Sequence, residues 1–399
     1  MDERRSGLGG EWTRRAGAYV RQPGAYRAFL PASLPPDPPV RFDAELLQLL
    51  SLAERGLGRL DGITRILPDP DLFVAMYVRK EAVLSSQIEG TQASLEQVIE
   101  YEASEEQGRG DAGEVVNYVA AMNHGLSRLR ELPLSLRLIK EIHARLMRGV
   151  RGGHHEPGEF RRSQNWIGPP GALLADAAYV PPPPEEMAHA LAQLERFIHE
   201  SAETPILIKC ALVHSQFETI HPFLDGNGRI GRLLITFMLC HAGVLSRPLL
   251  YLSYYFKRLR SEYYERLQAV RDTGDWEGWV KFFLTGVAAV AAEAADTAGR
   301  IVAMQAEHRM AVQRASRSQT PAQLLDALYQ HPVVSTRRAA ALLGVKYRRA
   351  RRAMQALERL GLLEASSGRK RNRGFLYRPY VDLLREGTEP AAGPPLTAE

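Results

Sequence analysis

A short polar loop rich in glycine separates two apolar helical segments, and it constrains the fold more than any other feature of the sequence. The loop and the turn after it read His-Pro-Phe-Leu-Asp-Gly-Asn-Gly-Arg-Ile-Gly-Arg, residues 221–232. Before it, apolar residues with helical spacing run from Ile208 to Ile220, and a second such face runs from Arg229 to Met238. The pattern predicts two largely buried helices that meet at this loop.

The loop has the features of a phosphate-binding site. Its glycines allow backbone N–H groups to converge where the second helix begins, and the helix dipole favours an anion at that point. Arg229 and Arg232 lie three residues apart, so they stand on neighbouring turns and can hold further phosphate oxygens. We therefore predict that the nucleotide-binding residues include Gly226, Asn227, Gly228, Arg229 and Arg232.

Two further side chains add metal and proton chemistry. Asp225 supplies a carboxylate beside the loop, which is how proteins commonly hold Mg²⁺ together with substrate phosphates. His221 can accept a proton near neutral pH. The alternative is a helix cap followed by a tight turn, which each residue favours when taken singly. Their combination instead favours a site for attack on a nucleotide phosphate.

Two other phosphate-binding motifs do not fit the sequence. Gly226-x-Gly-x-x-Gly231 has the spacing of a dinucleotide fingerprint, but no apolar strand precedes it and no acid follows about 20 residues later. A P-loop requires Gly-x4-Gly-Lys-Ser/Thr, which the sequence lacks.

Residues 221–232 match the signature His-x-Phe-x-Asp-Gly-Asn-Gly-Arg-x-x-Arg of the Fic family at every defined position, and the chain resembles this family over roughly residues 40–300. The resemblance implies a helical core that transfers AMP from ATP to a Ser, Thr or Tyr hydroxyl of a target protein and releases pyrophosphate. It implies that His221 deprotonates the hydroxyl, that Asn227 and the loop amides hold the α-phosphate, and that Asp225 binds Mg²⁺. Arg229 and Arg232 would orient the other phosphates.

The phosphorylating Doc branch replaces the Asp-Gly-Asn-Gly centre with an Ala-Asn-Lys type, which is absent here, so AMP transfer is favoured. A nucleotide donor other than ATP remains an alternative.

A second segment resembles the inhibitory motif of the family. Ser85-Ser-Gln-Ile-Glu-Gly90 matches Ser/Thr-x-x-x-Glu-Gly/Asn, and Ser85 and Glu89 share one face of a helix. The resemblance implies that Glu89 pairs with Arg232, the arginine that would grip the γ-phosphate, and so inhibits transfer. A variant of this interpretation is that the same carboxylate orients water for removal of AMP, which would make the enzyme bifunctional.

The glycine- and proline-rich stretch 151–184 predicts a short β-hairpin, with β-compatible pieces at 161–167 and 178–180. By resemblance this hairpin is a flap that pairs with an extended target segment. Its candidate docking residues are Asn165, Trp166 and Ile167.

The nucleobase contacts rest on weaker signals. Tyr254 follows the second core helix where the family lines its adenine pocket, and an aromatic core stripe is an equal alternative. The family often has an Asn shortly afterwards, whereas this chain has Phe256-Lys-Arg-Leu. Gln216, about one turn before His221, is a further candidate for the same pocket.

The C-terminal part of the chain is strongly basic. Residues 335–378 hold thirteen Lys and Arg against two acids, a balance of +11, which leaves −6 for the rest of a chain whose net charge is +5. The pattern of helix, Gly344 turn, helix and basic loop resembles a winged helix-turn-helix domain. A surface that docks protein is the alternative to DNA. The candidate nucleic-acid contacts are Arg348, Arg349, Arg352 and Arg371.

The length of 399 residues predicts two or three domains, and 45% apolar with 24% charged residues excludes a largely disordered chain. Two cysteines without a signal-like N-terminus predict a cytoplasmic protein without a membrane span. A DNA-binding regulator that uses the core as a nucleotide sensor remains the rival function, and a homodimer or self-modification is compatible with the sequence. The fold class is mainly α, and the expected domains are an N-terminal arm (1–40), a helical region with the inhibitory helix (41–110), the Fic core (111–300), a linker (301–320), the winged helix (321–385) and a flexible tail (386–399).

Overall fold

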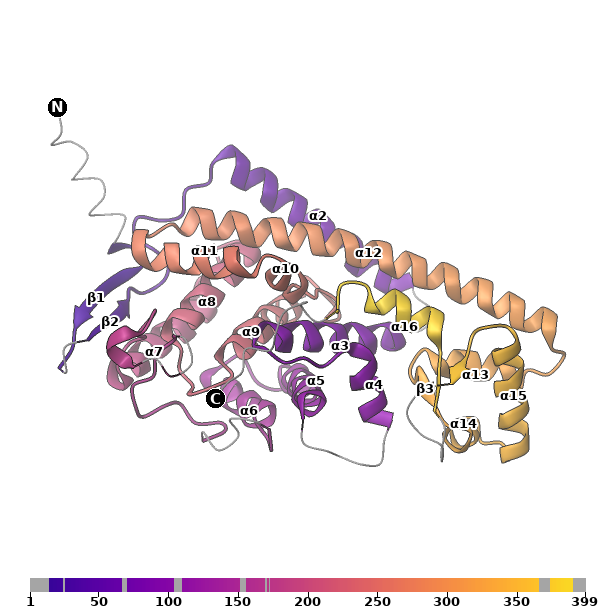
Figure 1. Ribbon diagram of the computed structural model, residues 1–399. Helices are drawn as coiled ribbons and strands as arrows, with labels where there is room; N and C mark the ends of the chain where they lie inside the picture. Colours follow the sequence, from indigo (N-terminus) through magenta and orange to yellow (C-terminus); the bar gives the residue numbers. More distant parts are fainter. Residues whose placement is uncertain are drawn as a thin grey trace.

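The computed structural model describes residues 14–23, 26–66, 70–103, 110–150, 156–168, 171, 173–365 and 374–389. These residues are mainly helical, with two small antiparallel sheets (Figure 1). The elements of the first half are β1 (Gly17–Arg21), β2 (Arg27–Pro31), α2 (Ala44–Ile66), α3 (Pro70–Ile88), α4 (Leu95–Ala103), α5 (Asp111–Arg128), α6 (Leu136–Leu146), the 3₁₀ turn η1 (Leu174–Asp176) and α7 (Pro184–Glu200).

The second half begins with the two helices that flank the polar loop. Breaks at 201–205, 242–252 and 274–275 divide the region that the sequence predicts to be interrupted only at the loop. The elements are α8 (Ile206–Ile220), α9 (Asn227–His241), α10 (Ser253–Arg258), α11 (Arg260–Thr273), α12 (Trp276–Ala315), α13 (Thr320–Leu328), β3 (Val333–Val334), α14 (Thr336–Leu342), α15 (Tyr347–Arg359), β4 (Glu364–Ala365), β5 (Phe375–Leu376) and α16 (Arg378–Arg385).

Helix α8 is the centre of the core. Every residue from Leu207 to Ile220 is buried, as expected of a helix that has packing partners on all sides. It packs on α9, and α9 in turn lies against α5, where Gly125 leaves room for the ring of Phe237. Cys210 is buried and Cys240 is partly buried, and both are free thiols.

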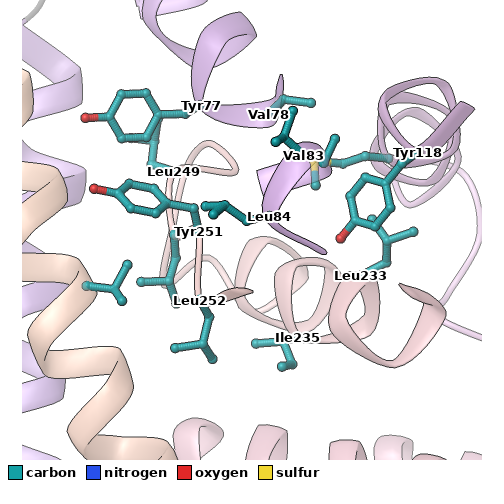
Figure 2. Packing of buried hydrophobic residues seen from close by; sticks show 14 of the residues in the cluster. Tyr77, Val78, Val83, Leu84, Tyr118, Leu233, Ile235, Leu249, Tyr251 and Leu252 are labelled. Carbon is teal, nitrogen blue, oxygen red and sulfur yellow. The ribbon is translucent and has the colours of Figure 1, made fainter. Parts of the chain in front are cut away.

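Helix α3 joins this core from the N-terminal half. Figure 2 shows Val83 of α3 close to Tyr118 of α5, Leu233 of α9 beside that tyrosine, and Leu84 of α3 next to Tyr251. Because these side chains are buried, the last turns of α3 have a fixed place beside α9. This packing brings the predicted inhibitory segment next to the polar loop.

The longest helix, α12, runs alongside α2 across the molecule (Figure 1). Asp275 caps its start by accepting a hydrogen bond from the Gly278 amide at 2.9 Å. Gly56 of α2 faces the methyl group of Ala291, so the two backbones approach closely. The helix continues to Ala315, and the predicted linker at 301–320 is therefore mostly helical.

Among the described helices, α12 alone has the length and composition of a membrane-crossing segment, and 61% of its most apolar window is buried in the protein.

The predicted N-terminal arm contains a hairpin. Strands β1 and β2 pair antiparallel with Gly17 opposite Pro31. Arg15, just before β1, is buried and forms an ion pair with Glu277 at the start of α12, with 2.8 Å between Nη1 and Oε2. The amide of Phe29 in β2 also donates to the Val180 carbonyl at 2.9 Å. This segment is thus part of the folded body.

The C-terminal region groups α13, α14 and α15 at one end of the molecule (Figure 1). The three short strands form an antiparallel sheet in the order β3-β5-β4. Gly344 has φ 61° in the turn between α14 and α15, a backbone conformation that glycine adopts without strain. The basic loop between β4 and β5, with Arg371, lies outside the described residues. Residues 386–389 of the predicted flexible tail are packed against the body.

Candidate functional site

The polar loop begins and ends with residues in the left-handed backbone region. His221 caps the C-terminal end of α8 with φ 48°, and Gly226 precedes α9 with φ 80°. Helix α9 then starts at Asn227, so the amides of its first turn point into the loop. The sequence prediction of two helices meeting at a glycine loop is confirmed, and the loop has the backbone of an anion site.

Asn227 holds the loop in shape. Its Oδ1 accepts from the Phe223 amide at 2.8 Å, and its Nδ2 donates to the Phe223 carbonyl at 2.8 Å. Both polar atoms of the side-chain amide form hydrogen bonds within the loop. Asn227 can therefore affect a bound phosphate by keeping the loop backbone in shape. The predicted side-chain contact with the α-phosphate is therefore not what this arrangement favours.

Arg161 supports the loop from outside, and sequence reasoning missed it. The side chain is buried, and Nε donates to the His221 carbonyl at 2.9 Å. Its Nη2 also donates to the Pro182 carbonyl. Burial lowers the pKa of this guanidinium to about 10, so it remains charged at neutral pH. An arginine in a stretch rich in glycine and proline gives no pattern that would reveal this position.

His221 stays neutral at physiological pH. Burial lowers the pKa of its imidazole to about 4, and the positive charges of Arg161 and Arg271 act in the same direction. Its Nδ1 is buried and has no hydrogen-bond partner among the described residues. A neutral ring with an unengaged nitrogen can accept a proton.

A second histidine fixes the position of Asp225. His143 accepts a hydrogen bond from the Gly158 amide at Nδ1, 2.8 Å, which leaves Nε2 to donate to the Asp225 carbonyl at 3.0 Å. The His143 ring stacks on Phe223 with 3.7 Å between centroids. Burial lowers the pKa of His143 to about 4. No sequence pattern indicates this role, because His143 lies in an ordinary amphipathic helix.

Asp225 carries the one carboxylate of the loop. Its Oδ1 accepts from the Gly226 amide at 2.5 Å and lies 3.4 Å from Arg229 Nη2, while the side chain is partly exposed. No group of three or more His, Cys, Asp or Glu side chains that could hold a metal occurs among the described residues. A single partly exposed carboxylate fits a Mg²⁺ ion whose remaining ligands are phosphate oxygens and water.

Arg229 is buried against α5. Its Nη1 lies 3.4 Å from Glu114 Oε2, and both side chains are less than a tenth exposed. Thr91 shares the same carboxylate oxygen at 3.4 Å. Glu114 therefore balances the charge of Arg229 in the fold.

Arg232 is held by α3. Its Nε donates to Ser85 Oγ at 2.8 Å, and its Nη2 donates to the Ser85 carbonyl at 3.0 Å and to Glu89 Oε1 at 2.6 Å. Burial would raise the pKa of Glu89, but the charge and hydrogen bond of Arg232 outweigh it and keep the pKa below its usual value. A Cβ added at Gly228 would overlap Glu89 Oε1, so the carboxylate lies directly on the loop.

A buried carboxyl lies one turn before Ser85. Glu81 accepts from the Ser253 hydroxyl and, at 3.2 Å, from the Tyr118 hydroxyl. Burial raises its pKa to about 7, partly countered by these hydrogen bonds and by the charge of Arg232. Glu81 thus ties α3 to α5 and α10 close to the Arg232 contact.

Two predicted nucleotide contacts lie elsewhere. Gln216 is buried and its Nε2 donates to the Ala32 carbonyl at 2.7 Å, so the amide faces the N-terminal segment. The ring of Tyr254 packs so closely on Gly387 that a Cβ there would overlap it. Tyr264 of α11 was not predicted. It is 43% exposed as a residue, while burial of its hydroxyl raises the pKa to about 12; the charge of Glu89 acts in the same direction and that of Arg232 in the opposite one.

Among its described residues, 161–168, 171 and 173–180, the predicted flap contains one antiparallel bridge and no extended strand. Ile167 and Tyr179 exchange both backbone hydrogen bonds, at 2.8 and 3.0 Å. Trp166 and Ile167 are exposed, while Asn165 donates from Nδ2 to the Phe223 carbonyl at 2.9 Å. Prolines and glycines on both sides limit regular pairing, so the strand prediction was too long.

The predicted nucleic-acid contacts that fall within the described residues lie on α15. Arg348, Arg349 and Arg352 are exposed. Arg349 donates from Nε to Thr320 Oγ1 at 2.8 Å, so it also joins α15 to α13. Within the described part of the chain, Arg348 and Arg352 have no ion-pair partner, and both are available to a ligand.

The fold and site define a helical protein with an anion loop, and comparisons with known proteins show which family it is similar to. The model described as Fic/DOC family N-terminal matches residues 47–127, and the model described as Fic/DOC family matches residues 133–239. Over these residues the chain is similar to the Fic/DOC family and to the N-terminal region of that family.

Curated relatives match part of the chain. The protein adenylyltransferase Fic of Drosophila ananassae is 32% identical over 176 residues, which make up 42% of this chain and 31% of that protein. The corresponding protein of Drosophila virilis is 33% identical over 176 residues, with shares of 42% and 32%. The chain thus spans about a third of the length of the curated relatives it matches.

A solved structure shares the fold. A Fic family protein from Desulfovibrio desulfuricans G20 aligns with a TM-score of 0.55 and 20% identity, over 85% of this chain and 97% of that one.

Proposed function

We propose that the chain is a protein adenylyltransferase that moves AMP from ATP to a Ser, Thr or Tyr hydroxyl of a target protein. The observation that carries the proposal is the position of a neutral His221 at the rim of the anion loop, with Arg232 on the second turn of α9 beyond it. The curated relatives named protein adenylyltransferase Fic support the same reaction class.

In this reaction His221 takes the proton of the target hydroxyl. The hydroxyl oxygen then forms a bond to the α-phosphorus of ATP, and the bond to the β-phosphate oxygen breaks. Pyrophosphate leaves with the electron pair of that bond. A base that is neutral before the reaction is suited to this step, and the loop amides stabilise the charge that develops on the α-phosphate.

The phosphates are divided among the residues of the loop and α9. The amides at the start of α9, including that of Gly228, receive the α-phosphate, while Asp225 Oδ1 holds the Gly226 amide and so shapes the loop. Arg229 and Arg232 face the phosphates beyond the α-phosphate. Asp225 would hold Mg²⁺, which neutralises phosphate charge when it is bound. Asn227 and Arg161 keep the loop backbone in place.

For the nucleobase, we assign Tyr264 as the stacking residue in place of Tyr254. The ring of Tyr264 is exposed and lies within electrostatic reach of the Glu89–Arg232 pair, whereas Tyr254 is covered by Gly387. An exposed aromatic ring beside a phosphate site suits a flat base.

Glu89 inhibits the transfer in this account. Its carboxylate occupies Arg232 and lies on Gly228, so a γ-phosphate cannot take that place while α3 is docked. Release of Glu89 would free both positions at once.

The target binds through the flap. The exposed Trp166 and Ile167 flank a backbone bridge, and an extended segment of the target can add to this edge. The same surface can present a hydroxyl of a second copy, so self-modification is included in the proposal.

Labelled ATP tests the reaction. The parent protein, Glu89→Gly and His221→Ala are incubated with α-labelled or γ-labelled ATP and Mg²⁺. We expect protein-bound label from the α position only, strongest in Glu89→Gly and absent in His221→Ala. Label from the γ position would mean phosphoryl transfer, and no label from either would favour another donor or the regulator described next. Loss of label from modified protein on adding active Glu89-containing enzyme would indicate AMP removal.

The second candidate is a DNA-binding regulator in which the Fic domain senses a nucleotide. The exposed cations of α15 favour it, since Arg348 and Arg352 have no ion-pair partner among the described residues and a winged helix would present this helix to DNA. The two functions can coexist in one chain, because α15 and the anion loop are on separate elements.

A further inference from the structure

The last described residues, Glu386–Glu389, follow α16 and return to the body of the protein beside α3 and α10. Figure 1 shows α16 between α3 and the C-terminal group of helices. We infer that this segment is a clasp that holds the inhibitory end of α3 in place, so that the C-terminal region controls the Fic site. The inference rests on the proposed function and adds its regulation.

The central contact is a buried hydrogen bond to α3. Gln87 Nε2 donates to the Thr388 carbonyl at 3.0 Å and to the Ala93 carbonyl at 3.0 Å. Thr388 is 1% exposed, so this polar residue is buried in the body of the protein. Its amide and hydroxyl both bond to the Arg385 carbonyl, at 2.8 and 2.9 Å, so the segment forms a defined turn.

A glycine makes the close approach possible. Gly387 has φ 78°, and a Cβ at this position would overlap the ring of Tyr254 in α10. The turn therefore requires glycine both for its backbone conformation and for its packing. Tyr254 lies in turn over Lys80 of α3, with 5.8 Å from Nζ to the ring centroid.

The two ends of the clasp carry surface contacts. Glu386 forms a two-pronged ion pair with Arg300, at 2.8 and 2.9 Å, and Lys257 Nζ donates to the Glu389 carbonyl. Exposed pairs of this kind contribute little stability, so they set the position of the segment while the buried contacts hold it.

The clasp acts on the predicted inhibitory residue through the last turn of α3. Gln87 is two residues before Glu89, and the Gly90 amide donates to the Gln87 carbonyl at 3.2 Å. A backbone movement that carries Glu89 away from Arg232 would shift this turn and break the Gln87–Thr388 bond. The free energy of the clasp is thus added to that of the Glu89–Arg232 pair.

The clasp also belongs to the region with the basic surface. Arg378 and Arg385 of α16 lie 3.4 and 3.9 Å from Glu96 of α4. A ligand that displaces α16 would therefore release the clasp and raise AMP transfer.

Truncation tests the clasp. A chain ending at Arg385 lacks it, and a chain ending at Glu389 is the matched control. A buried hydrogen bond with its packing corresponds to an increase in AMP transfer of about five- to tenfold in the shorter chain. We expect no increase in the control. In the Glu89→Gly background the Glu89–Arg232 pair is absent, so the two truncated chains should have equal AMP-transfer activity.

A point substitution covers the case in which the shorter chain does not fold. Gly387→Val collides with Tyr254 and should activate the full chain in the same way, with unchanged circular dichroism. Hydrogen exchange of residues 82–92 should be faster in Gly387→Val, which is a readout independent of activity. An active Glu89→Gly protein with no activation by Gly387→Val and no faster exchange would overturn the clasp alone. An inactive Glu89→Gly protein would overturn the proposed function instead.

Discussion

Arg232 of α9 and Glu89 of α3 form an ion pair of 2.6 Å although 143 residues separate them in the sequence. The arginine is 2% exposed and the carboxylate 34% exposed. The pair therefore stands at the boundary between core and solvent, where a ligand phosphate could compete for the guanidinium.

Glu89→Gln separates the charge of this contact from its shape. The amide can still accept a hydrogen bond from Arg232, but it loses the charge assistance, which is about half of the strength of such a bond. We expect AMP transfer about tenfold above the parent and below Glu89→Gly, measured with α-labelled ATP. An activity equal to that of the parent would show that occupancy of the loop, and not the ion pair, inhibits.

Gly228→Ala tests how closely the Glu89 carboxylate covers the loop. The new methyl group would overlap Glu89 Oε1, so either the loop or the glutamate must shift. We expect a loss of about 1 kcal/mol in the free energy of unfolding, and a much smaller loss in the Glu89→Gly background. Thermal melting of the parent, the two single variants and the double variant measures this coupling. An equal loss of unfolding free energy in both backgrounds would mean that the new methyl group does not collide with Glu89.

The sequence allowed prediction of the parts of the site that depend on local chain geometry. Helical spacing on both sides of residues 221–232 and the glycines between them are enough to place an anion loop at the start of α9. The pairing of Glu89 with Arg232 depended on a family resemblance, because no local pattern tells which distant helices pack together.

Other parts depend on tertiary packing that the sequence does not encode locally. Helix α8 is buried on all sides, so its pattern could not tell that Gln216 faces the N-terminal segment. Asn227 was assigned to the α-phosphate from the family resemblance, whereas its side-chain amide forms hydrogen bonds within the loop. Arg161 has no sequence signal, since the carbonyls it supports come together only in the folded chain.

The pH dependence of stability contains opposing contributions. Burial lowers the pKa of His143 to about 4 and that of His214 to about 3, against about 6.5 when unfolded. The two histidines contribute fully to the free energy of unfolding above pH 6.5. This contribution is lost as the pH falls toward 4, because over that range only the unfolded state takes up protons. Burial raises the pKa of Glu81 and Glu218 to about 7, so these carboxyls act in the opposite direction between pH 4.5 and 7.

His143→Gln isolates one of these contributions. Between pH 7 and pH 5 the parent should lose about 2 kcal/mol relative to the variant, since glutamine does not titrate. Urea unfolding of both proteins at the two pH values gives the difference, and the buried carboxyls cancel in it. A difference that is independent of pH would mean that His143 is protonated in the folded protein or exposed to solvent.

Tyr264→Ala tests the assignment of the base-stacking residue. Loss of stacking on a base costs roughly 1–3 kcal/mol, so the KM for ATP in the Glu89→Gly background should rise by about tenfold or more. Tyr264→Phe, which keeps the ring and removes only the hydroxyl, is the matched control and should leave the KM unchanged. An unchanged KM in Tyr264→Ala would contradict the assignment.

The exposed cations of α15 give the last prediction. Reversing Arg348 and Arg352 to glutamate removes two cations that have no ion-pair partner among the described residues. If α15 contacts phosphates, affinity for duplex DNA should fall at every sequence tested, and the slope of log K against log salt should decrease by about two. Fluorescence anisotropy with a labelled duplex measures both quantities.

The control for this experiment reverses two other exposed arginines, Arg59 of α2 and Arg196 of α7, so that the net charge changes equally. Equal weakening by the control pair would mean that the general positive charge of the chain attracts DNA. No binding by the parent at low salt would leave a protein partner as the ligand of this surface. Because the clasp joins α16 to α3, DNA that binds the parent should also change its AMP transfer, and the Gly387→Val protein should not respond.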